Sequence, residues 1–464
     1  MSAETTFQSF DPNTLPDEGD SSESFTPNWA PDAPRGGRAV LTRALKDSAT
    51  VPLFLAQTFI QSLRDVGYNT TTSALEEHVD NAIEAGATEI RIYFRQSGRR
   101  GDFKTDVMVY DNGRGMAPNV LKVATSLGGS MSYGNRSAIG RFGMGMKTAA
   151  LSMSSTMELY SWQESRGAYC MVLDTNAIGR ERANVIELPD PRFVGDLPSE
   201  VTDLFIRAVN FPKDKAEQHL LSASDSDLWE RIGPRGTVVY MPECDRLSFA
   251  TDRKLVEHAM KEMARVYRRH IAKGLKLYVN NRRLIAFDPT YAMADAWHAR
   301  VKELRAKTSR LVDKKAVKIQ RNESSPDTAE AVIGIYALPI EDWGSLPRKV
   351  QKNDLQIFDG YNVSVLRNER ELYAGFLSDI APRHSAASWF RIEIDFPGEL
   401  DEAFGVAANK QGVRLKSRVV DAINNAVGDQ ITTLTEEIKR FQSKRAAERI
   451  GSALSASEAA SQRG

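Results

Sequence analysis

A glycine-rich segment in the first third of the chain limits the fold more than any other feature. Gly128–Gly145 contains six glycines, with Ser, Asn and Tyr residues between them. Glycine weakens both helices and strands, so this segment predicts a long loop between regular elements. Short helices are predicted on either side of it, at residues 119–127 and at Lys147–Ser154.

Helical and strand patterns alternate around this loop. A helix is predicted at residues 71–86, where Thr and Ser residues stand at the start and Gly86 at the end. Further helices are predicted at residues 253–273 and at Ser417–Arg449. Apolar and alternating runs predict strands at Ile90–Phe94, Asp106–Tyr110, Met157–Gln163, Tyr169–Asp174, Thr237–Met241, Lys276–Val279, Thr328–Leu338, Asn362–Leu366 and Trp389–Asp395. The pattern indicates two mixed α/β blocks, divided near residues 243–252.

The overall composition is that of an ordinary globular protein. The 464 residues include 61 Lys and Arg against 61 Asp and Glu, and 41% are hydrophobic. The longest apolar run, around Val51–Ile60, is too short to cross a bilayer, and the first residues lack a secretory signal. Cys170 and Cys244 are too few for a disulfide framework or a zinc site. We therefore expect a cytoplasmic protein with no membrane partner.

The balanced total hides a strong segregation of charge. Residues 1–36 carry seven acids, one base and five prolines, which predicts a disordered acidic arm. Residues 251–321 carry 19 Lys and Arg against 7 Asp and Glu. This excess fits either a solvated helix face or a surface that contacts nucleic-acid phosphates, and both readings stay open. Residues 452–464, rich in Ser and Ala, predict a frayed tail.

The first candidate for chemistry is a carboxylate–amide pair in the helix predicted at residues 71–86. Glu77 and Asn81 are four residues apart, so both point to one side of that helix. An amide oxygen suits magnesium, which prefers hard oxygen ligands, and a carboxylate can activate a water molecule that attacks a phosphate. Taken alone, the pair also fits an exposed polar face without a role.

The second candidate is an apolar strand that ends in Asp111-Asn112-Gly113-Arg114-Gly115-Met116. Asn-Gly is a strong turn signal, so a plain hairpin turn is the favoured explanation when this segment is taken alone. In a functional reading, the Asp111 carboxylate accepts a hydrogen bond from an exocyclic amine such as that of adenine. Gly113 and Gly115 would then let the backbone approach a flat ring closely.

The third candidate is the series Gly140-Arg141-Phe142-Gly143-Met144-Gly145-Met146-Lys147-Thr148, which precedes a predicted helix. Amide groups at a helix N-terminus bind phosphate oxygens, and glycines leave room for them. The series is not a Walker loop, because Met146 stands where glycine is required before Lys-Thr. The fourth candidate, Gly236-Thr237, leads into a buried strand and also fits a turn before that strand.

Taken in order, these four motifs resemble those of the GHKL ATPases, the superfamily of gyrase B, the ninety-kilodalton heat-shock chaperones, histidine kinases and MutL. The resemblance covers roughly residues 50–243, and the wording Asp80-Asn81-Ala82-Ile83-Glu84-Ala85-Gly86-Ala87-Thr88 is closest to MutL and the MORC ATPases. Glu84 departs from the Asp that is usual in those families. The resemblance implies an α+β fold: a Bergerat-type two-layer α/β sandwich with a mixed, mostly antiparallel sheet and helices on one face. A second, transducer-like α/β domain and a C-terminal helix would follow.

The resemblance also implies a role for each matched residue. Glu77 is expected to be the general base, Asn81 the magnesium ligand, and Asp111 the adenine reader. The other expected ATP-binding residues are Gly113, Gly115, Met116, Gly140, Arg141, Phe142, Gly143, Met144, Gly145, Met146, Lys147, Thr148 and Thr237. In the second half, Asn409-Lys410-Gln411 resembles the tripeptide of MORC transducer domains, so Lys410 is expected to reach the γ-phosphate. The implied divisions are an acidic arm at 1–36, an ATPase domain at 37–243 with a lid at about 117–147, a transducer-like domain at 244–416 and a helix with a frayed tail at 417–464.

The function implied by the resemblance is a slow, magnesium-dependent ATPase that works as a clamp. ATP would order the lid and join two copies of the chain, and hydrolysis through Glu77 would reopen them. The basic residues 251–321 would contact DNA, in a restriction or other defence system against mobile elements, with a nuclease or helicase as partner. The alternative is a chaperone-like scaffold that closes on a protein client. A histidine kinase is disfavoured, because no histidine precedes Glu77.

Overall fold

The structure is a computed structural model, and it describes most of the chain after residue 58. The described residues are 67–99, 102–128, 144–164, 166–180, 188–207, 225–381, 384–406 and 412–461, together with Phe59, Ser62, Arg64 and Asp65. The acidic arm predicted at residues 1–36 lies outside them, and so does most of the glycine-rich loop.

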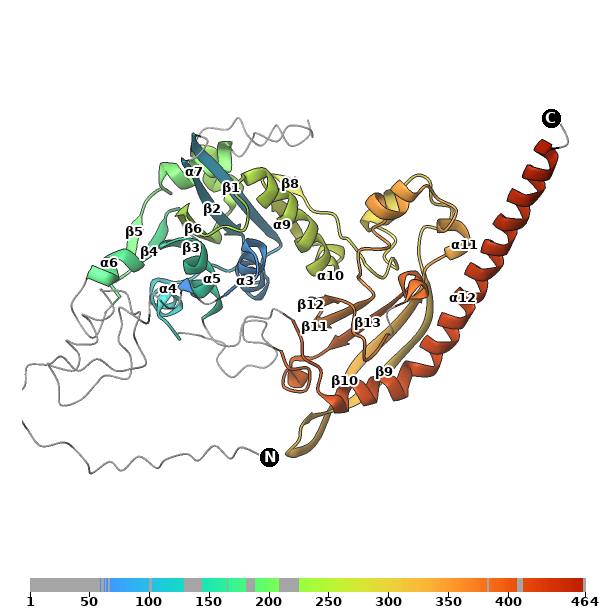
Figure 1. Cartoon of the computed structure of the whole chain (residues 1–464). Coiled ribbons are helices and arrows are strands. Elements are labelled where there is room, and N and C mark those ends of the chain that lie inside the picture. Colours follow the sequence, from blue (N-terminus) through green and yellow to red (C-terminus); the bar gives the residue numbers. More distant parts are fainter. Residues whose placement is uncertain are drawn as a thin grey trace, which may run out of the picture. The chain divides into compact units, whose positions relative to one another are not determined.

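The first of two β-sheets has eight strands in the order β5-β4-β3-β6-β2-β1-β7-β8 (Figure 1). The strands are β1 (Glu89–Arg99), β2 (Asp102–Asp111), β3 (Thr156–Gln163), β4 (Ala168–Asp174), β5 (Arg192–Val194), β6 (Arg235–Cys244), β7 (Lys276–Val279) and β8 (Arg282–Arg283). All neighbouring strands pair antiparallel except β1 and β7, which run parallel.

Alternating side chains of this sheet point to two separate cores. Val107 and Val109 on β2 pack with the helices α3 (Thr71–Glu84), α4 (Pro118–Thr125), α5 (Gly145–Met153) and α9 (Asp252–Val266). Met108 and Tyr110, which alternate with them in sequence, face α7 (Ser199–Arg207) and α8 (Asp225–Ile232). The period-two alternation of a strand thus builds a helical layer on one face and a smaller cluster on the other. The short helix α6 (Thr175–Arg180) follows β4.

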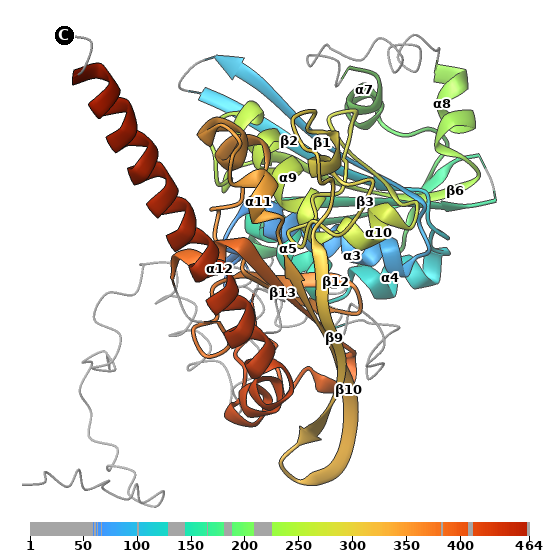
Figure 2. The same cartoon turned by 90° about the vertical axis from the view of Figure 1, so that its right-hand side faces the viewer.

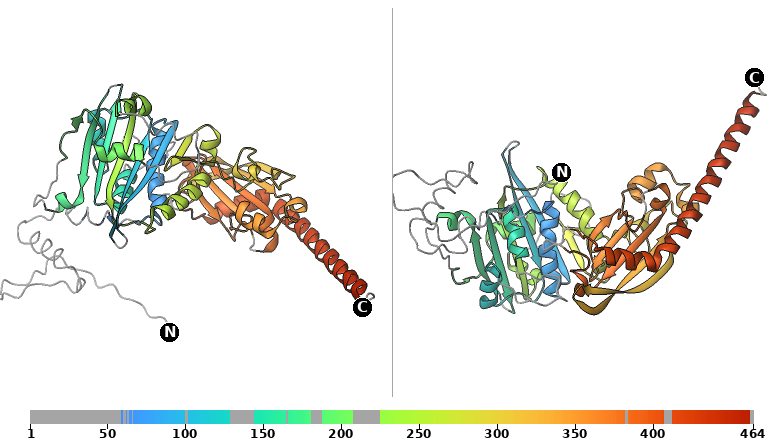
Figure 3. Two further views of the ribbon diagram at one scale, coloured as in Figure 1. Left: turned by 90° about the horizontal axis from the view of Figure 1, so that it is seen from above. Right: turned by 60° about the horizontal axis from the view of Figure 1, so that its bottom comes forward.

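The second sheet has five strands in the order β12-β11-β13-β10-β9. They are β9 (Arg310–Asn322), β10 (Ser325–Ala337), β11 (Val363–Arg367), β12 (Arg370–Gly375) and β13 (Phe390–Phe396), and only β11 and β13 run parallel. The helix α12 (Ser417–Ser461) buries an apolar stripe, from Val419 to Ile438, against this sheet and the nearby α11 (Ile340–Trp343). Figure 2 shows α12 beside the long β9–β10 hairpin, and Figure 3 shows its C-terminal half continuing past the sheet.

The structure confirms the predicted fold class, a mixed α+β protein with a large, mostly antiparallel sheet, a second α/β region and a C-terminal helix. The helices α7 and α8 on the other face were not predicted. The first sheet also extends past the predicted boundary at residue 243, because β7 pairs with its strand β1.

Two local predictions are wrong. The helix predicted at residues 253–273 is divided at Tyr267, where the backbone leaves helical geometry and α10 (Arg268–Ala272) begins. The frayed tail predicted at residues 452–464 is helical as far as Ser461, because Ala and Ser residues continue α12 without a stop signal. Among the described residues, no helix is both long and apolar enough to cross a membrane.

Candidate functional site

Helix α3 carries the predicted carboxylate–amide pair. It begins with a capping box, in which Thr70 and Ser73 exchange side-chain and backbone hydrogen bonds of 3.0 and 3.1 Å. The Glu77 side chain is buried and Asn81 is half-buried. A Cβ atom on Gly145 would collide with Oε2 of Glu77. The carboxylate of Glu77 therefore lies against the N-terminus of α5, and a side chain at position 145 would displace it.

Asp111 stands at the end of β2, in the middle of the first sheet. Its Oδ1 accepts a hydrogen bond of 2.8 Å from the amide of Gly113. A Cβ atom on Gly113 would lie 2.7 Å from that oxygen and 2.8 Å from Cβ of Ala85, so glycine permits the close turn. Burial raises the pKa of Asp111 to about 7. The carboxyl group is thus positioned to accept a hydrogen bond, although its burial makes the ionised form unfavourable.

Thr237 lies directly beside Asp111. It pairs with Asp111 in the β2–β6 register and with Ser161 in the β3–β6 register. The hydroxyl groups of Thr237 and Ser161 are 3.0 Å apart, and Ser161 Oγ also accepts a hydrogen bond of 2.8 Å from the amide of Met116. By strand parity, Asp111, Thr237 and Ser161 all face the helical layer that contains α3. Three adjacent strands thus place polar side chains on the same face at one edge of the sheet: at the end of β2, near the end of β3 and near the start of β6.

Ser161 was not predicted as a site residue. It lies in the strand predicted at Met157–Gln163, and the sequence gives no sign that this strand would become the neighbour of β6. A second missed residue is Tyr68, whose hydroxyl group is 3.0 Å from Oγ1 of Thr148 and 3.4 Å from the carbonyl oxygen of Gly145. Burial and the nearby Glu77 raise the pKa of Tyr68. The Tyr68 hydroxyl group thus contacts the start of α5, next to the Glu77 carboxylate.

The residues next to the glycine-rich loop have different surroundings. Lys147 is buried, and its Nζ donates a hydrogen bond of 2.8 Å to the carbonyl oxygen of Ala124 in α4. Burial lowers the pKa of this ammonium group to about 8. Met144 meets Gly128, whose amide lies 3.1 Å from the Met144 sulfur, so the two ends of the loop are in contact. Met116 and Met146 pack at the edge of the core under α3.

The structure brings most of the predicted residues together on one side of the first sheet. Gly115 has a left-handed backbone, with φ of 64°, and a Cβ atom on it would collide with the carbonyl oxygen of Trp162. Five predicted site residues lie outside the described part of the chain: Gly140, Arg141, Phe142, Gly143 and Lys410. Their roles stay predictions.

One comparison with known proteins bears on this arrangement. Residues 68–203 match the family model described as histidine kinase-, DNA gyrase B- and HSP90-like ATPase. The match supports the GHKL superfamily for this part of the chain, and with it an ATP-binding ATPase domain. It includes Glu77, Asn81 and Asp111, and it ends before Thr237. No curated protein matches the chain.

Proposed function

We propose that this chain is a magnesium-dependent ATPase whose nucleotide lies between α3, the start of α5, the ends of β2 and β3 and the start of β6. The observation that carries the proposal is the convergence of two groups of side chains. Asp111 at the end of β2 and Thr237 near the start of β6 lie on the face that packs against α3, and α3 places Glu77 against the N-terminus of α5.

Each residue has a chemical role in this proposal. The Asp111 carboxylate accepts a hydrogen bond from the adenine amino group, and the hydroxyl group of Thr237 supports it through water. The amide oxygen of half-buried Asn81 fits magnesium, which takes few protein ligands beside phosphate oxygens. When bound, magnesium neutralises phosphate charge. The buried Glu77 carboxylate orients the attacking water and takes its proton.

Two substitutions separate binding from hydrolysis. Glu77→Ala removes the base and leaves the adenine contacts, so the dissociation constant for ATP is expected to stay within about threefold while turnover falls at least about 100-fold. Asp111→Ala removes the adenine contact and is expected to abolish both. Calorimetry with ATP and a phosphate-release assay measure the two quantities. Unchanged turnover in Glu77→Ala would dismiss the assignment of the base.

We also propose, from the resemblance to MORC- and MutL-type enzymes, that ATP joins two copies of the chain into a clamp. Lys410 would sense the γ-phosphate and report it to the second sheet. Light scattering with a non-hydrolysable ATP analogue tests this step. A monomer under saturating analogue would contradict it.

The proposed client of the clamp is DNA, in a defence system with a nuclease or helicase partner. The basic excess of residues 251–321 is partly used inside the protein, because Arg265, Arg268 and Arg269 bind carboxylates of the second sheet. The remaining exposed bases include Arg282 and Arg283 on β8 and the following residues: Arg300, Lys302, Arg305, Lys307, Arg310, Lys314 and Lys318. These exposed bases form the surface that we propose for phosphate contacts.

Salt dependence distinguishes DNA from a protein client. If Lys314 and Lys318 contact phosphates, replacing both with Ala lowers the slope of log affinity against log salt by about two. Lys273→Ala is the matched control, because that exposed lysine already pairs with Glu369. No DNA affinity at low salt would favour the chaperone-like alternative, in which the clamp closes on protein.

A further inference from the structure

A second polar face of α3 lies next to the one that carries the candidate catalytic residues. Glu76 and Asp80 are four residues apart and are both buried. Arg370 contacts both of them: its Nη2 lies 2.9 Å from Oε2 of Glu76, and its Nε lies 3.2 Å from Oδ1 of Asp80. The hydroxyl group of Tyr267 donates to the same Asp80 oxygen, at 2.8 Å. Two carboxylates of α3 thus share one buried arginine.

Arg370 belongs to the second sheet, and that sheet fixes its position. It is the first residue of β12 and follows a tight turn in which Asn368 and Glu369 have left-handed backbones. Arg367, which ends the strand before the turn, has a different carboxylate partner: it binds both oxygens of Asp401, at 2.5 and 3.0 Å. The turn itself is held by the ion pair between Lys273 and Glu369. The guanidinium group of Arg370 therefore approaches α3 from a rigid support.

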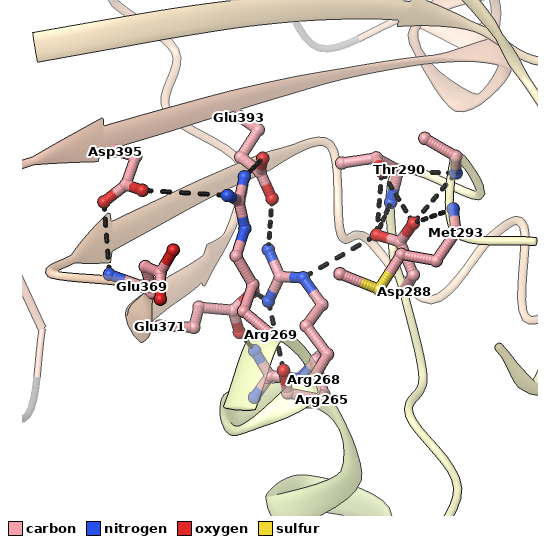
Figure 4. Close-up of polar contacts among 11 residues, drawn as sticks. Arg265, Arg268, Arg269, Asp288, Thr290, Met293, Glu369, Glu371, Glu393 and Asp395 are labelled. Atoms are coloured by element: carbon pink, nitrogen blue, oxygen red, sulfur yellow. Dashed lines mark hydrogen bonds and ion pairs between the residues drawn. The ribbon is translucent and has the colours of Figure 1, made fainter. Parts of the chain in front are cut away.

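The neighbouring contacts join α9 and α10 to the same sheet with the opposite arrangement of charge (Figure 4). Arg268 in α10 lies 2.5 Å from Glu371 and 2.7 Å from Glu393, and Arg265 and Arg269 contact these same two carboxylates. Here the helices supply the cations and the second sheet supplies the anions. At Arg370 the sheet supplies the cation. Because a buried charge that loses its partner is costly, these pairs fix α9 and α10 against the second sheet, and Arg370 and Tyr267 add α3 to the same arrangement.

The link to the candidate site is the geometry of one helix. Glu76 precedes Glu77, and Asp80 precedes Asn81, so the two pairs lie on neighbouring faces, about 100° apart around α3. A rotation of α3 that lengthened either contact of Arg370 would also move Glu77 and Asn81. Burial opposes the charge of Arg370, but Asp80, Tyr267 and Glu76 raise its pKa, and the nearby Glu77 carboxylate adds to this effect.

We propose that Arg370 is a positioning residue: through Glu76 and Asp80 it couples the second sheet to α3 and sets the orientation of Glu77 and Asn81. For its effect on turnover, the inference rests on the proposed ATPase function. For its effect on how firmly α3 is held, it rests only on the contacts of α3. This contact gives the second sheet a route to the nucleotide helix that is separate from Lys410.

The test compares two buried arginines of the same hairpin in the full chain. Arg370→Gln removes the contact with α3, while Arg367→Gln removes a buried ion pair with Asp401, which follows the last strand of the second sheet. In Arg370→Gln we expect turnover to fall about tenfold while the dissociation constant for ATP changes less than about threefold. In Arg367→Gln we expect a comparable loss of thermal stability with normal turnover. Equal losses of turnover in the two variants would overturn the proposal.

A double-mutant cycle shows whether Arg370 acts through α3. In a Glu76→Gln background, Arg370→Gln is expected to reduce turnover less than it does in the wild-type chain, because one of its partners is already absent. Strictly additive effects would reject the coupling.

Hydrogen exchange keeps the inference separate from the proposed function. Without nucleotide, amides of residues 76–81 are expected to exchange faster in Arg370→Gln than in Arg367→Gln. Suppose that the wild-type protein failed to bind ATP, but that exchange still differed between the two variants. The ATPase proposal would then fail, and the positioning role of Arg370 would stand. Equal exchange in both variants would overturn the positioning role, whatever the activity.

Discussion

Replacing Asp111 by Asn is expected to have two opposite effects: it weakens ATP binding and stabilises the free protein. Binding weakens because the carboxylate that accepts the adenine amino hydrogen is lost. Stability rises because the wild-type carboxyl group is buried, and burial raises its pKa from 3.8 to about 7. Asn keeps an oxygen that can accept the 2.8 Å hydrogen bond from Gly113.

The size of the stabilising effect follows from the shift in the pKa. One pKa unit corresponds to about 1.4 kcal/mol, so burying the ionised group costs at most about 4 kcal/mol. Between pH 4 and pH 7 the folded state holds a proton on Asp111 that the unfolded state releases. The free energy of unfolding therefore falls as the pH rises through this window and is lowest, as far as Asp111 is concerned, above pH 7. In the Asn variant this fall in the free energy of unfolding does not occur, because Asn does not titrate.

Thermal unfolding of both proteins at pH 5, 6, 7 and 8 measures the effect. The difference in melting temperature is expected to be smallest at pH 5, where about a third of the loss is present, and to grow to at most roughly 10 °C at pH 8. Taking the difference removes contributions from other groups that titrate in this range, such as Glu76, whose pKa burial raises to about 7. A difference that does not change with pH, or an Asn variant less stable at pH 8, would refute the reasoning.

Two further predictions concern residues close to Glu77. Gly145→Ala places a methyl group where Oε2 of Glu77 lies, so turnover is expected to fall at least about tenfold while ATP binding is largely kept; a phosphate-release assay with normal turnover would contradict this. His78 is buried, and burial lowers its pKa to about 4, so stability is expected to fall by up to about 3 kcal/mol as the pH drops from about 6.5 to 4. His78→Leu removes a group that must stay neutral when folded, and pH-dependent denaturant unfolding should show the acid sensitivity reduced; an unchanged pH profile would count against it.

The sequence predicted the parts of the site that depend on short-range pattern. Helical spacing placed Glu77 and Asn81 on α3, and an apolar run placed Asp111 at the end of a strand. Strand order could not be predicted in this way, because β6 follows β3 by more than 70 residues and still lies between β3 and β2. The contact of Thr237 with Ser161 comes from that order, so no local signal reveals it.

Charge was the least predictable property. The excess of bases in residues 251–321 suggested either a solvated face or a surface for phosphates, but Arg268 is fully buried against Glu371 and Glu393. These carboxylates lie more than 100 residues later in the chain, so a local count of charge could not include them. The β9 strand was missed for a related reason, because its many exposed and half-buried polar residues hide the alternation.

The placement of acids on α3 explains why one helix can serve two neighbours. Glu76, Glu77 and Asp80 are all buried within two turns, and carboxylates so close together repel one another. Arg370 offsets this repulsion from the side of the second sheet, and a cation held at Asn81 would do so from the side of the nucleotide. Because the same carboxylates feel both cations, binding at one face changes the electrostatic cost at the other. The stability of α3 and its response to the second sheet are therefore expected to depend on whether magnesium and ATP are bound.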